Sequence, residues 1–270
     1  MASGAPPPRT VLVVGATGSI GRLVVDEAIR RGHVVRALAR DPDRARQVAG
    51  PAQVFIGDVT RPETLRGALD GVDAVVFTLG SDGLGEAGAE AVNYGGVRNI
   101  LGILVPQKVR LVLMTAIGVT ARAGNYSWPT AVHDWKRRSE RLVRASGLPY
   151  TIIRPGWFDK NRSDQLRPVL LQGDTRHAGD PGDGVIARRQ IAQVLVACLD
   201  SDHALQKTFE LVAETGAAPD SFDKLFAVLD ADRDGPLDGV RDLANMPVNE
   251  EPQRVRDDLT ALRGRLDGPN

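Results

Sequence analysis

Apolar runs of strand length alternate with segments of helical periodicity over most of the chain. The strand-like runs, rich in β-branched residues, are predicted near 10–15, 33–39, 52–58, 73–80, 109–116, 150–156 and 208–213. Amphipathic segments of helix length lie between most of them, at 19–31, 62–70, 87–104, 132–146 and 188–200. Strands that alternate with helices form right-handed crossovers, which build a parallel sheet covered by helices on both faces. The pattern therefore predicts a doubly wound α/β domain.

The hydrophobic pattern also divides the chain into three parts. Residues 1–9 form a Pro-rich stretch that is expected to be a flexible tail, and residues 10–213 carry the alternating pattern. From 214 to 270 the sequence is polar and rich in Pro and Asp, with two further helices predicted at 219–230 and 251–266. We therefore expect one large domain, including its ligand pocket, followed by a small polar and helical extension.

Composition and charge narrow the classes of function. Lys and Arg together number 34, as do Asp and Glu, so the formal net charge is zero and no basic field exists to attract nucleic acid or an anionic membrane. No apolar run approaches the roughly 18 residues of a membrane span. The single cysteine, Cys198, lies in the apolar stretch IAQVLVACL and is expected to be a core thiol of a cytoplasmic protein. The expected partner is a small-molecule substrate, and the oligomeric state stays open, with a homodimer as one option.

A glycine-rich turn follows the first predicted strand. The strand leads directly into GATGSIG, residues 15–21, and an amphipathic helix follows. Glycines at such a turn let backbone amides approach a pyrophosphate, and the helix N-terminus adds partial positive charge. This context predicts a dinucleotide-binding turn in a Rossmann-type sheet. The expected cofactor contacts are Gly15, Thr17, Gly18, Ser19, Ile20 and Gly21.

The spacing of these glycines, with Thr17 before the second one, resembles the TGxxGxxG signature of the short-chain dehydrogenase/reductase superfamily. The resemblance is greatest to the atypical branch of that superfamily, the NmrA-like NAD(P)H-binding proteins, and covers roughly residues 10–213. Further along, VHDWKRRSERLVRASGLPYTIIRPGWF, residues 132–158, resembles the K…E…L…SGL.YTI.RPG run of this group. The resemblance implies a Rossmann-type fold, an NAD(P)H cofactor and reductase-type chemistry.

Arg40 favours NADP(H) as the cofactor. It follows the second predicted strand, where a protein that prefers NAD carries an acidic residue for the adenosine ribose. A guanidinium instead suits the 2′-phosphate of NADP through paired, charge-assisted hydrogen bonds. Asp41 follows immediately, and the alternative is that Arg40 is a solvated surface charge. We therefore expect NADP(H), with NAD(H) as the second choice.

The resemblance implies further cofactor contacts along the chain. In GDVT, Asp58 and Val59 match residues that contact adenine, and the alternative for Asp58 is the cap of a helix that begins near Pro62. The end of the fourth strand matches a segment that passes the cofactor ribose, and the RPG loop matches one that lines the nicotinamide. The residues implied are Thr78, Leu79 and Gly80 at the ribose and Pro155 and Gly156 at the nicotinamide.

The resemblance also aligns Lys136 with the family lysine that holds the nicotinamide ribose. In much of the superfamily a tyrosine four residues earlier donates a proton to the substrate as hydride arrives, but here that position is Val132. Thr115, at the end of the fifth strand, is the nearest hydroxyl for orienting a substrate. Trp157 and Phe158 are expected to form an apolar wall of the substrate pocket, with a place in the core as the alternative.

Three side chains are candidates to replace the missing tyrosine. His133 lies three residues before Lys136 on the predicted helix, and an imidazole can donate a proton near neutral pH. An ordinary surface or packing histidine is the alternative. Tyr126, in the loop GNYSWPT, and Tyr94 are the other two, each equally compatible with a structural role.

No metal site is expected. The Asp-rich stretch that begins at Asp230 follows the first nine positions of an EF-hand calcium loop. Its twelfth position is Arg241, where a bidentate carboxylate is needed. The stretch is therefore predicted to be an Asp-rich surface turn.

The sequence thus predicts an NADP(H)-dependent oxidoreductase of the atypical short-chain type that acts on a small carbonyl or related unsaturated substrate. The alternative from a different class is a non-catalytic NADP(H)-binding sensor or regulatory protein of the NmrA-like type, which the missing tyrosine favours. A dehydratase or epimerase that uses the cofactor transiently ranks third.

Overall fold

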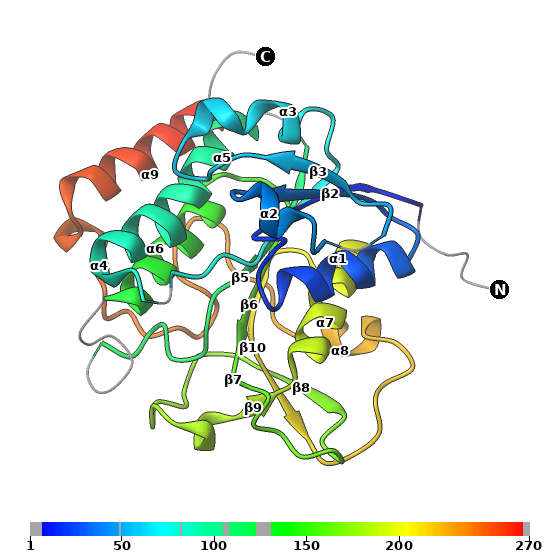
Figure 1. The fold of residues 1–270 in the computed structure, drawn as a ribbon. Coiled ribbons are helices and arrows are strands. Elements are labelled where there is room, and N and C mark those ends of the chain that lie inside the picture. Colours follow the sequence, from blue (N-terminus) through cyan, green and yellow to red (C-terminus); the bar gives the residue numbers. More distant parts are fainter. Residues whose placement is uncertain (1–6, 49, 82, 105–107, 123–130, 267–270) are drawn as a thin grey trace.

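A mostly parallel β-sheet runs through the centre of the molecule (Figure 1). The computed structural model describes residues 7–48, 50–81, 83–104, 108–122 and 131–266. The strands of the main sheet are β1 (Thr10–Val14), β2 (Val34–Ala39), β3 (Gln53–Ile56), β4 (Ala74–Phe77), β5 (Arg110–Met114), β6 (Tyr150–Pro155), β8 (Arg167–Leu171) and β10 (Lys207–Glu214). Their order is β3-β2-β1-β4-β5-β6-β10-β8, in which only β8 is antiparallel to its neighbour. Two short strands, β7 (Trp157–Phe158) and β9 (Val185–Ile186), pair separately.

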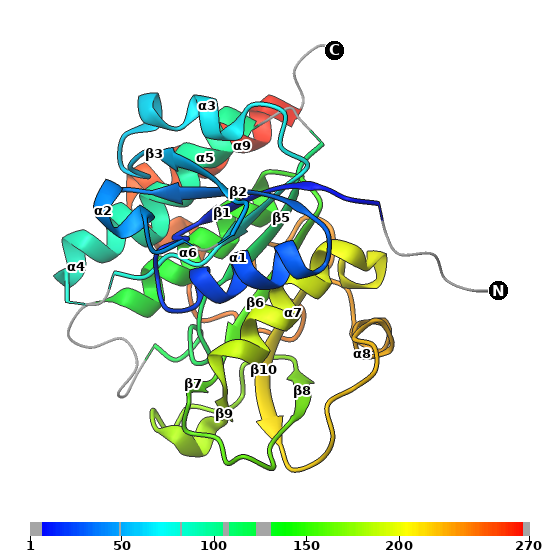
Figure 2. The same ribbon diagram turned by 45° about the vertical axis from the view of Figure 1, so that its right-hand side comes forward.

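Helices cover both faces of this sheet (Figures 1 and 2). One face carries α1 (Gly21–Arg30), α7 (Arg188–Asp200) and α8 (Asp223–Ala227). The other face carries α3 (Arg66–Leu69), α5 (Gly96–Leu104), α6 (Val132–Ala145) and α9 (Gln253–Leu266). The short helices α2 (Pro42–Ala45) and α4 (Gly85–Gly88) flank the strand ends, and a π-helical stretch, Ala89–Gly95, joins α4 to α5. None of the helices in the described part of the chain combines the length and the apolar character needed to cross a bilayer.

The alternation of side chains along the strands explains why a hydrophobic cluster forms on each face of the sheet. In β1, Leu12 and Val14 belong to the hydrophobic cluster under α5 and α6, whereas Val11 and Val13 belong to the cluster under α1 and α7. Successive side chains of a strand point to opposite faces, so a strand that is apolar at every position must be buried on both. Cys198 lies in the second cluster, fully buried, and burial raises the pKa of its thiol. The predicted core thiol is therefore confirmed.

The strand order creates a crevice at one edge of the sheet. The chain pairs β1 with β2 on one side and with β4 on the other, so the direction of the crossovers reverses between β1 and β4. In open α/β sheets a ligand binds beyond the carboxyl ends of the strands at such a reversal. The glycine-rich turn follows β1 directly at this point.

The predicted doubly wound α/β fold is confirmed, with differences at the edges. All seven predicted strands form, but β7, β8 and β9 were not predicted. β8 is an edge strand of five residues, RPVLL, whose second residue is Pro168, and a proline within a short apolar run argues against a strand. The predicted helix at 62–70 is split into a 3-10 turn, Pro62–Thr64, and α3, and the one at 219–230 is reduced to α8.

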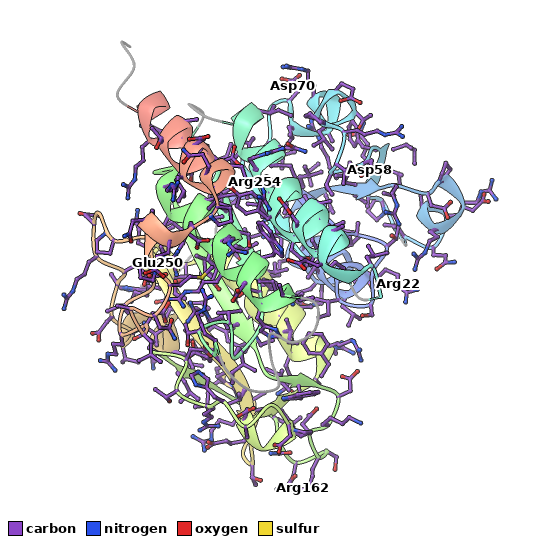
Figure 3. All side chains as sticks on the ribbon, turned by 90° about the vertical axis from the view of Figure 1, so that its left-hand side faces the viewer. Arg22, Asp58, Asp70, Arg162, Glu250 and Arg254 are labelled. Carbon is purple, nitrogen blue, oxygen red and sulfur yellow. The ribbon has the colours of Figure 1, made fainter. Side chains whose placement is uncertain are left out.

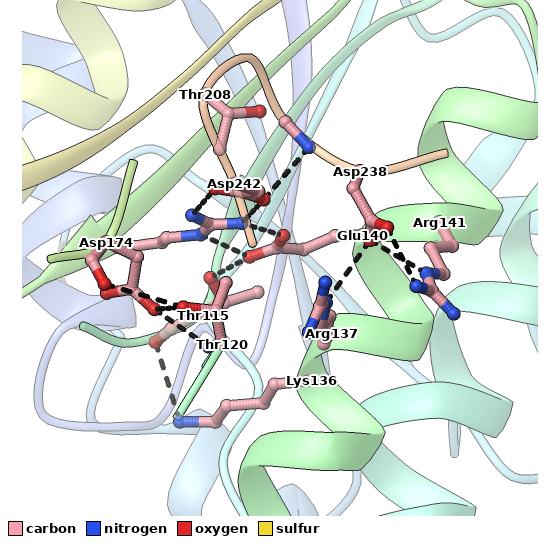
Figure 4. Close-up of polar contacts among 12 residues, drawn as sticks. Thr115, Thr120, Lys136, Arg137, Glu140, Arg141, Asp174, Thr208, Asp238 and Asp242 are labelled. Atoms are coloured by element: carbon pink, nitrogen blue, oxygen red, sulfur yellow. Dashed lines mark hydrogen bonds and ion pairs between the residues drawn. The ribbon is translucent and has the colours of Figure 1, made fainter. Parts of the chain in front are cut away.

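The chain beyond β10 packs against α6. Two buried arginines on α6, Arg137 and Arg141, form ion pairs with carboxylates of this segment (Figure 4). Arg144, whose side chain is 3% exposed, forms a third. The partners are Asp232, Asp238 and Glu251. The expected surface turn is confirmed in part: residues 233–236 are exposed, whereas Asp232 and Asp238 face arginines of α6. The division of the chain at 213 and 214 stays a prediction.

Aromatic and cationic side chains hold α9 against α6 on the face shown in Figure 3. The Trp135 ring contacts the guanidinium groups of Arg138 and Arg254, which lie 4.4 and 5.3 Å from its centroid. The Tyr94 ring lies 5.4 Å from that of Trp135, and its hydroxyl donates to Asp258 Oδ2 over 2.8 Å. Cation–π contacts of this kind add to the apolar burial of Trp135.

Candidate active site

The glycine-rich turn is shaped by close contacts that only glycine permits. Gly15 has a φ of 86°, and a Cβ added there would lie 2.9 Å from the carbonyl oxygen of Thr78. A Cβ on Gly21, the first residue of α1, would lie 2.1 Å from the carbonyl oxygen of Gly15. The Gly18 amide donates to that same oxygen over 2.9 Å. The turn is therefore a narrow backbone cradle at the N-terminus of a ten-residue helix, which fits a pyrophosphate.

A cavity of about 300 Å³ opens from this turn along the ends of β1, β2 and β4. Nine predicted cofactor residues line it: Gly15, Thr17, Gly18, Arg40, Asp58, Val59, Thr78, Leu79 and Gly80. Six lining residues were not predicted: Leu38, Asp41, Arg44, Gly57, Leu84 and Val92. Ser19, Ile20 and Gly21 do not line it; Ser19 is exposed at the turn, and Ile20 is buried beneath it. The cavity brings together residues from five separate segments of the chain.

The Thr78 side chain fastens the cradle to the sheet. Its hydroxyl donates to the carbonyl oxygen of Val14 over 2.9 Å, and its amide donates to the same oxygen over 2.9 Å. Thr78 is 8% exposed. Thr78 therefore fixes the position of the glycine-rich turn relative to β1 and β4.

Two guanidinium groups line the cavity at the end of β2. Arg40 and Arg44 both line it, whereas one carboxylate oxygen of Asp41 accepts a 2.8 Å hydrogen bond from the Asp43 amide and caps α2. Arg36, which precedes them on β2, donates to the carbonyl oxygen of Ala68 over 3.1 Å and does not line the cavity. This end of the cavity therefore contains two guanidinium groups, which can bind a phosphate through paired hydrogen bonds, together with one carboxylate.

Asp58 stabilises the turn after β3. Its Oδ1 accepts hydrogen bonds from the amide and the hydroxyl of Thr60, over 2.9 and 2.8 Å. Burial raises the pKa of this carboxyl, but the bonds from Thr60 and the charges of Arg40 and Arg61 outweigh burial, so the pKa is lowered. The 3-10 turn that begins at Pro62 has no side-chain cap. The alternative of Asp58 as a helix cap is therefore wrong, and its carboxylate stays ionised beside the cavity.

A second cavity, of about 270 Å³, lies at the ends of β5 and β6. It is mostly apolar, and its lining residues are Ala116, Ile117, His133, Pro155, Gly156, Trp157, Phe158 and Gly179. Five of them were predicted to be site residues. A Cβ on Gly156 would lie 2.4 Å from the carbonyl oxygen of Gly184, so the wall at this point admits only glycine. Trp157 is 37% exposed, which places it at the mouth of the cavity and not in the core.

Lys136 lies one helical turn from His133 on α6. Its Nζ donates to the carbonyl oxygen of Thr115 over 3.5 Å, which holds the ammonium at the end of β5 (Figure 4). Val132, where the superfamily has its tyrosine, packs against the apolar cluster under α6. The ammonium is therefore at the edge of the sheet where both cavities open, and no hydroxyl accompanies it at position 132.

The Thr115 hydroxyl lies elsewhere than expected. It donates to Glu140 Oε1 over 2.7 Å, Thr115 is 1% exposed, and it does not line the apolar cavity. Ala116 and Ile117, which follow it, line the cavity instead. This geometry gives Thr115 a structural contact and does not support a role in orienting substrate.

Of the two tyrosines considered as proton donors, only Tyr94 lies within the described residues. The Tyr94 hydroxyl is bonded to Asp258 on α9, the residue is 2% exposed, and burial raises the pKa of the phenol further above its usual range. Tyr94 is therefore a structural residue: it contacts α9 and does not line the apolar cavity. Tyr126 lies outside the described residues. Of the expected donors in the described part of the chain, His133 is the one that lines the apolar cavity.

Comparison with known families identifies the class of protein. The family model described as NAD(P)H-binding matches residues 15–202, which covers the cradle, both cavities and Lys136. The chain therefore belongs to the NAD(P)H-binding family, and its resemblance to the atypical, NmrA-like short-chain dehydrogenase/reductases is confirmed.

Individual relatives have different named functions. Sanguinarine reductase of Eschscholzia californica is 27% identical over 261 residues, which cover 81% of this chain and 95% of that protein. The photosystem II assembly factor Ycf39 of Synechocystis sp. is 26% identical over 207 residues, 75% of this chain and 62% of that protein. The crystal structure of the oxidoreductase ylbE from Lactococcus lactis has the same fold, with a TM-score of 0.67 at 18% identity over 83% of this chain and 100% of the other.

Proposed function

We propose that this protein is an NADP(H)-dependent oxidoreductase that reduces a small carbonyl compound or a related unsaturated substrate. The observation that carries the proposal is the pair of cavities at one edge of the sheet. One surrounds the phosphate cradle and has Arg40 in its lining, and the other is apolar and contains His133. Membership of the NAD(P)H-binding family and the relationship to a reductase support it.

Each part of the site has a role in this proposal. The amides of the glycine-rich turn bind the pyrophosphate, Arg40 binds the 2′-phosphate, and Lys136 holds the nicotinamide ribose. When bound, NADPH supplies a hydride to an electrophilic carbon of the substrate. His133, at the start of α6, donates the proton that balances this hydride, with Tyr126 or water as the other sources.

The apolar cavity indicates the kind of substrate. Trp157 and Phe158 present aromatic surface, and Ile117 and Pro155 complete a lining with few polar groups. A conjugated or aromatic electrophile gains more from such a lining than a sugar does, because each hydroxyl of a sugar would lose its hydrogen bonds to water. We therefore favour an aromatic carbonyl, a quinone or an iminium compound.

A non-catalytic NADP(H)-binding protein is the second candidate function. Val132 in place of the tyrosine favours it, and so does the relationship to an assembly factor. In that case the site would bind the cofactor and report its level without turning it over.

Single-turnover oxidation of NADPH separates the two candidates. We expect enzyme in excess of NADPH to oxidise it in the presence of some aromatic carbonyls, quinones or iminium ions, and we expect His133→Phe to slow this step while NADPH binding is retained. Tight NADPH binding with no oxidation across the whole panel would contradict the enzyme and support the sensor. Full activity of His133→Phe would remove His133 as the donor.

Arg40→Ala is expected to remove the preference for NADP(H). A charge-assisted hydrogen bond contributes about 1.5–3 kcal/mol, so the Kd for NADPH should rise about 10-fold or more while that for NADH changes by less than about 2-fold. The Kd values are measured by cofactor fluorescence titration. Arg46→Ala is the control, because Arg46 has a side chain 80% exposed and does not line the cavity. Equal losses for the two cofactors would contradict the assignment of Arg40 to the 2′-phosphate.

A further inference from the structure

Arg188 connects the glycine-rich turn to the wall of the apolar cavity. It is the first residue of α7, and its Nε donates to the Ser19 hydroxyl over 3.1 Å, although the two residues are 169 positions apart. Ser19 lies inside the turn between Gly18 and Ile20. The guanidinium is therefore held at the rim of the phosphate cradle by a contact that the sequence pattern does not predict.

The same guanidinium also contacts the substrate side of the site. It lies over the Phe158 ring, 5.2 Å from the centroid, and Phe158 lines the apolar cavity. It forms an ion pair with Asp159, whose Oδ1 in addition accepts a 2.9 Å hydrogen bond from the Arg188 amide. Asp159 has a φ of 54°, in the left-handed region that non-glycine residues seldom adopt. The ring, the carboxylate and the strained backbone together fix where the guanidinium points.

While Arg188 is paired with Asp159, its positive charge is neutralised and attracts an anionic ligand only weakly. The side chains of Arg188 and Asp159 are 36% and 47% exposed, so the pair lies in high-dielectric surroundings and is weak. A pyrophosphate in the cradle carries two negative charges, which repel the Asp159 carboxylate and attract the guanidinium. Because a guanidinium binds phosphate oxygens through two parallel N–H bonds, exchange of partner is favourable.

We propose that Arg188 binds the pyrophosphate of the nicotinamide cofactor and that it exchanges its ion pair with Asp159 for this contact. Arg188 then holds the cofactor from the start of α7, beside the start of α1, and its stacking on Phe158 makes the wall of the substrate cavity part of the same arrangement. Because both NADPH and NADH contain a pyrophosphate, Arg188 serves both cofactors equally. The inference rests on cofactor binding and on no step of the proposed reduction.

Binding titrations with four ligands test this role. For Arg188→Met we expect the Kd values for NADPH and for NADH to rise by the same factor, about 10-fold or more, and the Kd for adenosine 2′-monophosphate, which has no pyrophosphate, to change by less than about 2-fold. Adenosine diphosphate ribose keeps the pyrophosphate and lacks the nicotinamide, so its Kd should rise with that of NADPH. Arg189→Met is the control, because Arg189 is exposed and adjacent on the same helix.

The pattern of losses separates this inference from the proposed function. Arg40→Ala is expected to weaken NADPH and adenosine 2′-monophosphate but not NADH, so the two variants differ in their effects on NADH and on adenosine 2′-monophosphate. Neither result needs a substrate. Unchanged affinity of Arg188→Met for both dinucleotides would overturn the role of Arg188, whatever the outcome of the turnover experiment. A loss confined to NADPH would also overturn it, because the contact would then be to the 2′-phosphate.

Asp159→Asn tests the exchange of partners without removing the cation. An asparagine Oδ1 still accepts from the Arg188 amide, so the start of α7 keeps its hydrogen bond, but the competing negative charge is gone. We expect NADPH and NADH to bind about 3-fold more tightly to this variant, with the gain largest at low ionic strength. Weaker binding of both cofactors by Asp159→Asn would show that the intact pair is required and would overturn the exchange.

Discussion

Replacing Arg154 by leucine is expected to lower the free energy of unfolding by about 3–5 kcal/mol near neutral pH. Arg154, on β6, is fully buried and donates to Glu140, Glu210 and Asp242 over distances of 2.7 to 3.2 Å. Leucine leaves three buried carboxylates without their common cation, and an uncompensated buried charge is costly. Denaturant unfolding followed by circular dichroism measures the loss.

The pH dependence of this loss gives a second check. Burial raises the pKa of Glu210 to about 7, although the Arg154 charge lowers it. A carboxyl whose folded pKa lies above its unfolded value binds a proton in the folded state first, so its contribution to stability is complete at low pH and is lost as the pH rises through about 7. Without Arg154 this effect grows, so Arg154→Leu should cost less at about pH 5 than at about pH 8.

Arg167→Leu is the matched control for this prediction. Arg167 pairs with Glu214 at the surface, with side chains 53% and 45% exposed, and such a pair contributes about 0–1 kcal/mol. A loss for Arg154→Leu no larger than that for Arg167→Leu would contradict the stabilising role of the buried cluster.

Lys136→Met is expected to slow single-turnover hydride transfer about 100-fold or more. Methionine keeps the length of the side chain but removes the ammonium that is held 3.5 Å from the Thr115 carbonyl oxygen. In the proposed reaction, its removal deprives the nicotinamide ribose of a charged partner and the proton donor of a neighbouring positive charge. Stopped-flow measurement of NADPH oxidation reports the rate, and titration reports the Kd, which we expect to rise less than the rate falls.

The control for Lys136 is Lys160→Met. Lys160 is exposed, and it follows the aromatic wall of the apolar cavity by two residues without lining it. A Lys136→Met variant that keeps its single-turnover rate within about 3-fold of the unchanged protein would remove Lys136 from the reaction. Both variants should unfold at similar denaturant concentrations, because the Lys136 side chain is not fully buried.

Much of the cofactor site could be predicted from the sequence because its parts are local. The glycine-rich turn needs residues without a Cβ at fixed spacing, and Gly15 and Gly21 both prove to lie against backbone oxygens. Arg40 and Asp58 follow strands whose ends are evident from the apolar pattern, and both line the same cavity. Arg44 was missed, although it follows Arg40 by only four residues, in the short helix α2 that begins after the same strand.

Side chains whose partners are distant in the sequence could not be placed in this way. An arginine on a helix is by default solvent-facing, so nothing in the sequence distinguished Arg137 and Arg141, both fully buried, from the partly exposed Arg138 between them. Thr115 was expected at the substrate because it ends a strand, but its partner Glu140 lies on α6 and draws the hydroxyl to the other side. Tyr94 likewise pairs with Asp258, 164 residues later.

The sequence by itself determined the doubly wound sheet, the position of the phosphate cradle and the absence of a hydroxyl at Val132, because periodicity, glycine and residue identity are properties of short stretches. The tertiary structure alone decided which charged groups meet: Arg154 with Asp242 across 88 residues, Arg137 with Asp238 across 101, and Arg188 with Ser19 across 169. Such pairs form only when the folded chain brings distant segments together, and their contribution to the free energy of unfolding depends on how deeply they are buried. Local sequence patterns show neither which distant segments meet nor how deeply a side chain is buried.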